Sequence, residues 1–234
     1  MEAIVLAGGK AERLGEVAGG RPKPLVEVAG RPLVAYQLRL LGRAGVSRVI
    51  VSCAAGQGGL FERELDGSGP ELVLAEEPER LGRGGGIRFA ARRRLESGDV
   101  YALNGDELLD VDLVAMLDRH RASGAAATIA VAQPVSPFGV VELTEEDVVR
   151  GFSEGGRIPS WVSCGVYVLG EEALARFPER GDHETTTFPE LAAEGRLRAF
   201  RHEGLWLTVN TPKDLRRAEE HLTAHPEWLV TDPV

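Results

Sequence analysis

The residues best suited to chemistry are concentrated in the first 25 positions of the chain. An apolar run over residues 3–7 ends at Gly8 and Gly9. Residues 10–23 contain two glutamates and four cationic residues, which are Lys10, Arg13, Arg21 and Lys23. Glycines let backbone N–H groups approach an oxygen atom closely, and ammonium and guanidinium groups neutralise its charge. This stretch therefore predicts a phosphate-binding loop.

A second candidate site follows the apolar run that begins at Val100 and ends in Asn104, Gly105 and Asp106. A carboxylate just past the end of an inner strand is well placed to hold Mg²⁺ over the phosphates of a nucleotide. Further acids lie close by, and we expect one of them, Asp110, to cap the next helix.

Strand-like and helix-like segments alternate in the first half of the chain. We predict buried strands over residues 3–7, 48–54, 71–76, 100–104 and 124–134. Helices are expected between them, one starting at Pro32 and one preceded by the glycines Gly84, Gly85 and Gly86, whose absent side chains would leave its N-terminus open to a ligand. The alternation predicts βαβ units and a parallel sheet. In such sheets ligands bind beyond the carboxyl ends of the strands, where Gly8 and Gly9 fall.

The pattern changes after residue 137, where strand-like runs are separated by short turns. These runs are FGVVEL, DVVRGFSE and SWVSCGVYVLG. We expect them to add antiparallel strands to the parallel core and to close over a second substrate. The predicted fold class is α/β, with a Rossmann-like, mostly parallel mixed sheet flanked by helices.

Composition narrows the function classes. The chain has 234 residues and a net charge of −9, which argues against nucleic-acid binding over a broad surface. No run of 18 apolar residues predicts a membrane span, and the start of the chain does not read as a signal peptide. Cys53 and Cys164 lie in apolar runs and are expected to be buried free thiols. We therefore expect a cytoplasmic enzyme that binds neither nucleic acid nor membrane.

The opening segment resembles a known family. LAGGKAERL (6–14) followed by RPKPL (21–25) is similar to the motif L-A-G-G-x-G-x-R-L, then P-K-P-L, of the sugar-1-phosphate nucleotidyltransferases, with Ala11 at the third glycine. Weaker similarities follow in order along the chain, in segments 81–87, 104–106, 138–143, 151–156, 161–169 and 206–212.

The resemblance implies the reaction NTP + sugar 1-phosphate → NDP-sugar + pyrophosphate, with Mg²⁺ as cofactor. It implies that Arg13, Lys23 and Asp106 are catalytic and that Asp106 also holds the metal. The nucleotide-binding residues that it implies are Leu6, Ala7, Gly8, Gly9, Ala11, Gly82 and Asn104. For the sugar it implies Gly139 and Glu154. We expect one domain over 1–234, with a nucleotide-binding half (1–125), a sugar-binding half (126–225) formed in part by the added antiparallel strands, and a tail (226–234).

Several positions depart from the family pattern. Arg83 occupies the position of a family threonine, and Gly155 that of a lysine expected to bind the sugar phosphate. Thr208 occupies the position of an aspartate that commonly completes the metal site, so Asn210 is expected to assist in holding the metal. These departures keep open a catalytically impaired, nucleotide-sugar-binding regulatory protein. The molybdenum-cofactor guanylyltransferases and the cytidylyltransferases of isoprenoid synthesis fit less well, because they lack the late sugar-site segments.

Among substrates, guanylyl transfer to mannose 1-phosphate or heptose 1-phosphate is preferred. Thymidylyl or uridylyl transfer to glucose 1-phosphate is the alternative, and the oligomeric state stays open. We expect the five histidines on the surface: His120, His183, His202, His221 and His225. Trp228 is expected to anchor the tail.

Overall fold

A seven-stranded sheet forms the centre of the protein, which is described by a computed structural model over residues 1–67 and 69–228. The strand order is β12-β8-β11-β6-β1-β4-β5. The bounds are β1 Glu2–Leu6, β4 Arg48–Ala54, β5 Glu71–Glu77, β6 Val100–Asn104, β8 Ala127–Ala132, β11 Val162–Leu169 and β12 Leu197–Arg201. Only β11 runs antiparallel to its neighbours, β6 and β8; the other pairs in this sheet are parallel. The predicted Rossmann-like, mostly parallel mixed sheet is confirmed.

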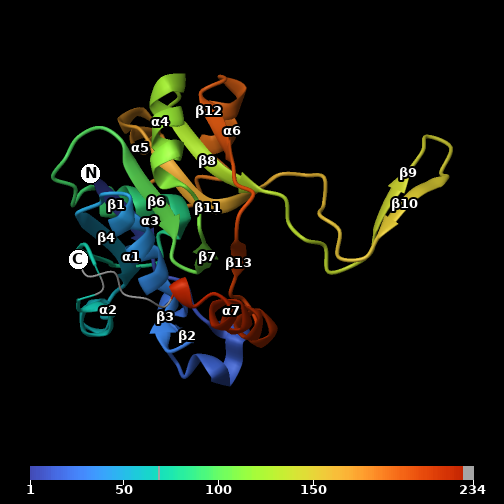
Figure 1. Cartoon of the computed structure of the whole chain (residues 1–234). Coiled ribbons are helices and arrows are strands. Elements are labelled where there is room, and N and C mark those ends of the chain that lie inside the picture. Colours follow the sequence, from blue (N-terminus) through green and yellow to red (C-terminus); the bar gives the residue numbers. More distant parts are fainter. Residues whose placement is uncertain (68, 229–234) are drawn as a thin grey trace.

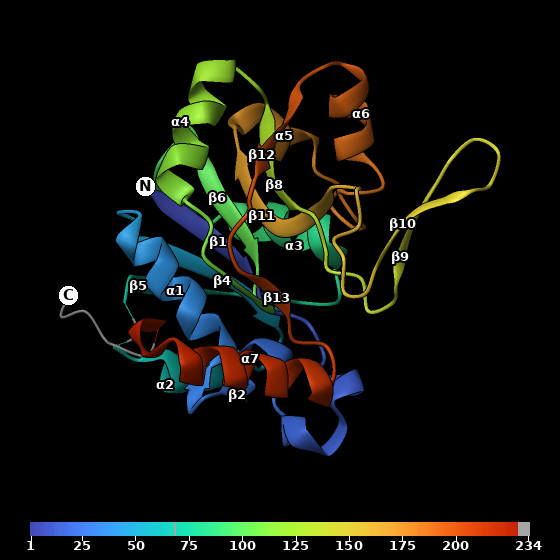
Figure 2. The ribbon, with the colours of Figure 1, turned by 45° about the vertical axis from the view of Figure 1, so that its right-hand side comes forward.

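Helices cover both faces of the sheet (Figures 1 and 2). They are α1 Leu33–Arg43, α2 Gly58–Leu65, α3 Gly82–Ala91, α4 Leu113–Ser123, α5 Glu171–Arg176, α6 Thr187–Ala193 and α7 Pro212–Ala224, with the 3-10 turns η1 Glu12–Ala18, η2 Lys23–Leu25 and η3 Pro226–Trp228. Side chains alternate along a strand, so Ala3 and Val5 of β1 pack with α1, α2 and α4, whereas Ile4 packs with α3, α5 and α6. A third apolar cluster joins η1, α1 and α7.

Two short ribbons position the loops at the carboxyl edge of the sheet. β2 (Glu27–Val28) pairs with β3 (Arg31–Pro32). β7 (Glu107–Leu109) pairs antiparallel with β13 (Trp206–Thr208), so the segment after β6 lies beside the segment that leads into α7. Thr211 caps α7 in a capping box with Asp214, and Pro212 follows at the first helical position, as the sequence predicts.

β9 (Val140–Leu143) and β10 (Val149–Ser153) form a separate antiparallel ribbon. Figures 1 and 2 show this ribbon extending away from the body of the molecule. We refer to residues 133–158 as the arm. Of the three runs expected to add antiparallel strands to the parallel core, only the one that forms β11 does so, whereas β9 and β10 pair with each other outside the central sheet.

The glycines of α3 have a packing role. Gly84, Gly85 and Gly86 lie inside the helix and are buried, whereas the sequence placed them ahead of it. A Cβ at Gly84 would lie 2.8 Å from the His183 backbone nitrogen, and one at Gly85 would lie 2.6 Å from the Glu179 carbonyl. At Gly84 and Gly85 the missing side chains therefore admit the segment after α5.

The expected N-cap of α4 was wrong. Asp112, not Asp110, caps α4, since its carboxylate accepts from the Ala115 N–H at 2.9 Å. Asp110 instead accepts from the Leu205 N–H at 2.7 Å and lies 3.2 Å from His202 Nε2. This contact ties the loop after β7 to the loop before β13.

Three of the five histidines are buried rather than on the surface: His120, His183 and His202. His120 Nδ1 lies 2.9 Å from Thr128 Oγ1, and His202 Nε2 lies 2.8 Å from the Leu205 carbonyl. The His183 ring is stacked on Phe177. Their charged neighbours in the sequence suggested exposure, whereas burial depends on how the chain packs around each ring.

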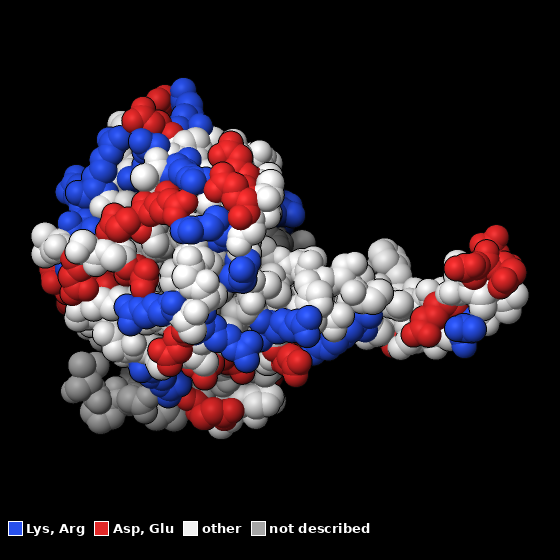
Figure 3. All heavy atoms as spheres, turned by 90° about the horizontal axis from the view of Figure 1, so that it is seen from above, with Lys and Arg blue, Asp and Glu red and all other residues white. Residues whose placement is uncertain are grey.

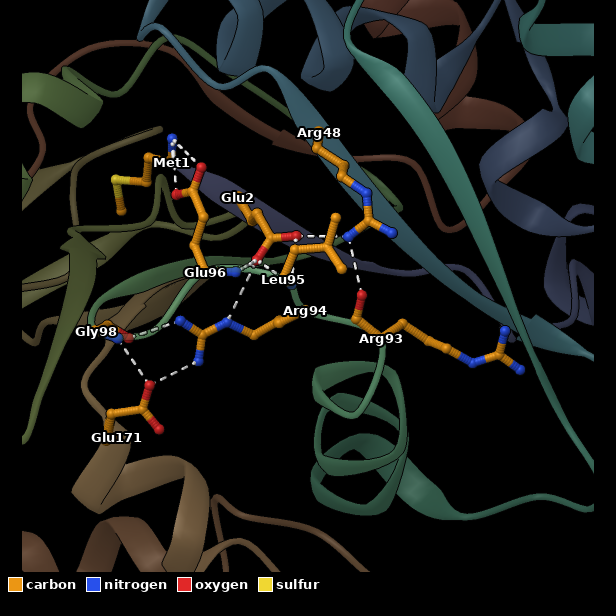
Figure 4. A network of polar contacts seen from close by, with 9 residues as sticks. All are labelled: Met1, Glu2, Arg48, Arg93, Arg94, Leu95, Glu96, Gly98 and Glu171. Carbon is orange, nitrogen blue, oxygen red and sulfur yellow. Dashed lines mark hydrogen bonds and ion pairs between the residues drawn. The ribbon is translucent and has the colours of Figure 1, made fainter.

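A polar network closes the amino end of the sheet (Figure 4). The Glu2 side chain is 2 % exposed and accepts from the backbone N–H groups of Leu95 and Glu96 and from the Arg48 guanidinium. Burial alone would raise the pKa of Glu2. The hydrogen bonds from these donors lower the pKa by more than burial raises it, so the pKa lies below its ordinary value.

The remaining expectations concern the thiols, the tail and the membrane. Cys53 and Cys164 are buried free thiols, as predicted. Trp228 packs against the cluster around α7, and its carbonyl accepts from Arg39 at 2.7 Å, which confirms the anchor. The predicted frayed tail beyond it, residues 229–234, lies outside the described residues. Within the described chain, no helix combines the length and apolar character of a membrane span.

Candidate active site

An ion pair between Lys23 and Asp106 lies at the carboxyl edge of the sheet. Lys23 opens η2, and its Nζ is 2.6 Å from Asp106 Oδ2. The Lys23 side chain is only 9 % exposed, while its backbone N–H donates to the Gly9 carbonyl at 3.1 Å. The loop after β1 is thus held against the loop after β6. Two predicted catalytic residues meet here.

Asn210 connects this ion pair to Arg13. Its Oδ1 accepts from Lys23 Nζ at 2.7 Å and from Arg13 Nη2 at 3.0 Å. The Asn210 backbone N–H donates to Asp214 at 3.1 Å, so the capping box of α7 holds the residue in place. Two cations and a carboxylate are therefore gathered around one amide, an arrangement suited to binding phosphate oxygens.

Gly105 permits the close approach of β1 and the end of β6. Its N–H donates to the Leu6 carbonyl at 2.8 Å, and a Cβ on Gly105 would lie 2.6 Å from that same oxygen. Only glycine fits without a shift of the backbone. The position of Asp106, the next residue, depends on this contact.

Glu107 places a second carboxylate beside Asp106. It is nearly buried, and its Oε2 accepts from Trp206 Nε1 at 3.0 Å. Burial and the charge of Asp106 raise the pKa of Glu107 to about 8, against the opposing effects of Trp206 and Lys23. Thr208 is its cross-strand partner. Glu107 was noted in the sequence only as one of several nearby acids, and its adjacency to Asp106 was the available signal.

A cavity of about 300 Å³ contains this cluster. It is lined by Leu6, Gly9, Lys23, Pro24, Arg83, Asn104, Asp106, Glu107 and Asn210. The structure therefore brings together six of the residues given a role from the sequence, and Arg13 reaches them through one of these, Asn210. The six are Leu6, Gly9, Lys23, Asn104, Asp106 and Asn210. Arg83, from the first turn of α3, was not proposed as a site residue. Its guanidinium is paired with Asp182 and Glu184.

Other residues singled out from the sequence lie elsewhere. Ala7 is buried in the core and Ala11 packs near η1. Gly8 lies beside Glu77, and a Cβ at Gly82 would meet the Gly181 carbonyl at 2.6 Å. None of these four lines the cavity described above.

The two sugar-side candidates lie in the arm, on either side of its ribbon. Gly139 precedes β9 and Glu154 follows β10, and the pairing of Val140 with Ser153 places both at the end of the ribbon nearer the body. Thr208 lines a different groove, at the root of the arm. The structure does not bring these residues into the cavity with Lys23.

The oxygen donors of the cavity fit a magnesium ion. Asp106 offers a carboxylate, and Glu107, with its raised pKa of about 8, offers a second carboxyl group that a bound cation would ionise. The buried Asn104 Oδ1 has no hydrogen-bond partner among the described residues. Within that part of the chain, no cluster of three or more His, Cys, Asp or Glu suited to a metal occurs. Mg²⁺ in phosphate-transfer sites is held by one or two carboxylates plus substrate phosphates, so this donor set is sufficient for Mg²⁺ bound together with a nucleotide.

Comparison with known families agrees with this geometry. A family model described as nucleotidyl transferase matches residues 2–225. The chain belongs to the nucleotidyl transferase family.

Two curated relatives are similar to nearly the whole of this chain. The chain is 32% identical to a mannose-1-phosphate guanylyltransferase of Mycobacterium tuberculosis, over 95% of this chain and 64% of the relative. It is 29% identical to the mannose-1-phosphate guanyltransferase beta-A of Xenopus laevis, over 100% of this chain and 69% of the relative. The chain thus spans about two thirds of the length of these relatives.

Solved structures share the fold. HddC from Yersinia pseudotuberculosis superposes with a TM-score of 0.74 at 22% identity, covering 94% of this chain and 99% of that one. HddC complexed with GMP-PN gives 0.71 over the same shares. A putative glucose-1-phosphate thymidylyltransferase from Bacillus anthracis, in complex with a sucrose, gives 0.75 at 16% identity over 94% and 95%.

Proposed function

We propose that this protein transfers a nucleotidyl group from an NTP to a sugar 1-phosphate and releases pyrophosphate. The observation that carries the proposal is the grouping of Lys23, Asp106, Asn210 and Arg13 at the carboxyl edge of a nucleotidyl transferase sheet. We take GTP and mannose 1-phosphate as the substrates, because the curated relatives named above are mannose-1-phosphate guanylyltransferases. Heptose 1-phosphate is the alternative sugar substrate for the same guanylyl transfer.

The chemistry needs little proton transfer. An ionised oxygen of the sugar phosphate attacks the α-phosphorus, a new P–O bond forms, and the bond to the β-phosphate oxygen breaks, with its electron pair leaving on pyrophosphate. The protein must align the two phosphates and offset the negative charge that accumulates. Lys23 serves the α-phosphate and Arg13 the leaving β- and γ-phosphates in this proposal.

Asp106 and Glu107 would hold Mg²⁺, with Asn104 Oδ1 as a neutral donor. The ion supplies charge neutralisation on the phosphate oxygens. Lys23 must then exchange its contact with Asp106 for the phosphate. Asn210 Oδ1 keeps Lys23 and Arg13 oriented while that exchange occurs.

The sugar side of the proposal depends on the body end of the arm. Gly139 and Glu154 flank the ribbon there, and Glu154 is exposed and so free to accept from sugar hydroxyls. Glu154→Gln should raise the KM for the sugar phosphate and leave the KM for the NTP unchanged. We also infer a cytoplasmic location, supported by the two free thiols.

The test is pyrophosphate release with Mg²⁺ over a grid of NTPs and sugar 1-phosphates. We expect the strongest rate with GTP and mannose 1-phosphate or heptose 1-phosphate. A strongest rate with dTTP or UTP and glucose 1-phosphate would replace the substrate assignment and keep the reaction. No turnover in any combination, with a nucleotide-sugar still bound, would replace the enzyme by a regulatory binding protein.

A further inference from the structure

One face of the arm is apolar and exposed. Val149 is paired with Leu143, and Phe152 with Val141, so these four side chains share one side of the ribbon. Their exposed fractions run from 45% at Val141 to 69% at Phe152. A two-stranded ribbon is only marginally stable alone in water, and a contiguous exposed apolar patch marks an interaction surface. The arm therefore needs a partner.

The root of the arm directs it away from its own body. Val135 and Arg157 form an antiparallel bridge. The Ser136 N–H donates to the Gly156 carbonyl, and the Ile158 N–H to the Pro134 carbonyl, each at 2.9 Å. This ladder sets the direction in which the ribbon leaves the body (Figure 2). The two strands of the arm therefore leave the body side by side.

The two ends of the arm differ in charge. The strands and turn at the tip carry four acids against Arg150: Glu142, Glu145, Glu146 and Asp147. Figure 3 shows these acidic side chains gathered at the far end of the arm. At the root, a groove of about 270 Å³ is lined by Arg157 and Arg217. Asp214 lines the same groove, but its carboxylate is used in the capping box of α7.

We propose that a second copy of this chain covers the arm. Two arms lie antiparallel about a twofold axis, with their apolar faces in contact and the acidic tip of each in the root groove of the other. The complementary charges lie at opposite ends of one projecting arm, so one chain does not bring them together. A twofold pair makes the contact twice, and the charges set its register.

The first test is the oligomeric state in solution. Light scattering coupled to gel filtration, over a range of protein concentrations, should give twice the chain mass. The double variant Leu143→Ser/Phe152→Ser should raise the dimer dissociation constant by roughly a hundredfold, because it removes four apolar side chains per dimer. Leu95→Ser is the matched control, since Leu95 is 80% exposed on the body. A monomeric wild-type protein, or a dimer indifferent to the double variant, would overturn the proposal.

The second test addresses the register. Cysteines introduced together by Glu146→Cys and Arg217→Cys should be joined between chains by a short bismaleimide, whereas each single variant should not; Cys53 and Cys164 are buried. A covalent dimer on a denaturing gel supports the arm exchange. A crosslink within one chain would mean that the arm folds back on its own body, and no crosslink would mean that the tip does not reach the groove. Either result rejects the proposal, and neither depends on the reaction assigned above.

Discussion

Lys23 and Asp106 form a 2.6 Å ion pair across 83 residues of sequence. The pair joins the loop after β1 to the carboxylate that follows β6. In the proposed reaction both groups contact the substrate, and the pair holds each in position until phosphate and metal replace the contact. A nearly buried ammonium group without hydrogen-bond acceptors would carry a desolvation cost. Asn210 Oδ1 gives Lys23 a second acceptor beside the Asp106 carboxylate.

Arg13→Ala should lower kcat/KM by a hundredfold or more, about 3 kcal/mol by analogy with loss of a preorganised donor at developing charge. Arg21→Ala is the control, because Arg21 lies on the same segment but pairs with Glu27 and Glu64. Initial rates of pyrophosphate release measure both. Equal rates for the two variants would show that Arg13 has no catalytic role.

Gly105→Ala should destabilise the fold by about 1–3 kcal/mol, since the added methyl group must displace the Leu6 carbonyl. It should also lower activity, because Asp106 follows directly. Gly9→Ala provides the contrast, since a Cβ there would meet nothing within 4 Å. Thermal unfolding of both variants tests this, and similar midpoints would show that the backbone at Gly105 shifts freely.

The sequence was informative where local signals agree with the tertiary structure. The apolar run before Gly8, the proline after Thr211 and the glycine before Asp106 each predicted an element or a turn that the structure contains. Asn210 was inferred only as a helper, because its contact with Arg13 depends on the path of the chain from β13 into α7.

Signals that depend on distant packing were misleading. His183 lies among charged neighbours in the sequence, yet its surroundings are the rings of Phe177, Phe188 and Tyr167, from other elements. The glycines of α3 were expected ahead of the helix but lie inside it, and the segment that packs on Gly84 and Gly85 comes about 95 residues later in the chain. The direction of the arm depends on hydrogen bonds at its root that no periodicity encodes.

His183→Phe should make the protein more resistant to acid. Burial lowers the pKa of His183 to about 4, from an ordinary value of 6.5. The unfolded chain therefore binds a proton before the folded one, and wild-type stability falls as pH drops from about 6.5 to about 4, by up to about 3 kcal/mol. Phenylalanine keeps the stacking on Phe177 and removes two ring nitrogens that lack hydrogen-bond partners among the described residues.

Denaturant unfolding of this variant and the wild type between pH 7 and pH 4 is the measurement. The free energy of unfolding of the variant should rise relative to that of the wild type as pH falls. His225→Gln, at an exposed position, should follow the wild-type curve. Parallel curves for His183→Phe and wild type would show that His183 protonates freely in the folded state.

Glu2→Gln should destabilise the fold at neutral pH by about 1–3 kcal/mol, because it removes a buried charged acceptor of two backbone N–H groups and of Arg48. The folded pKa of Glu2 lies below its ordinary value of 4.5. Its stabilisation is therefore present above pH 4.5 and is lost as pH falls through the folded pKa. The difference between variant and wild type should then shrink in acid. Glu96→Gln, whose side chain is 54% exposed and pairs with the N-terminus, should cost less than about 1 kcal/mol. An equal loss for both variants in denaturant unfolding would contradict the special role of Glu2 at the amino end of the sheet.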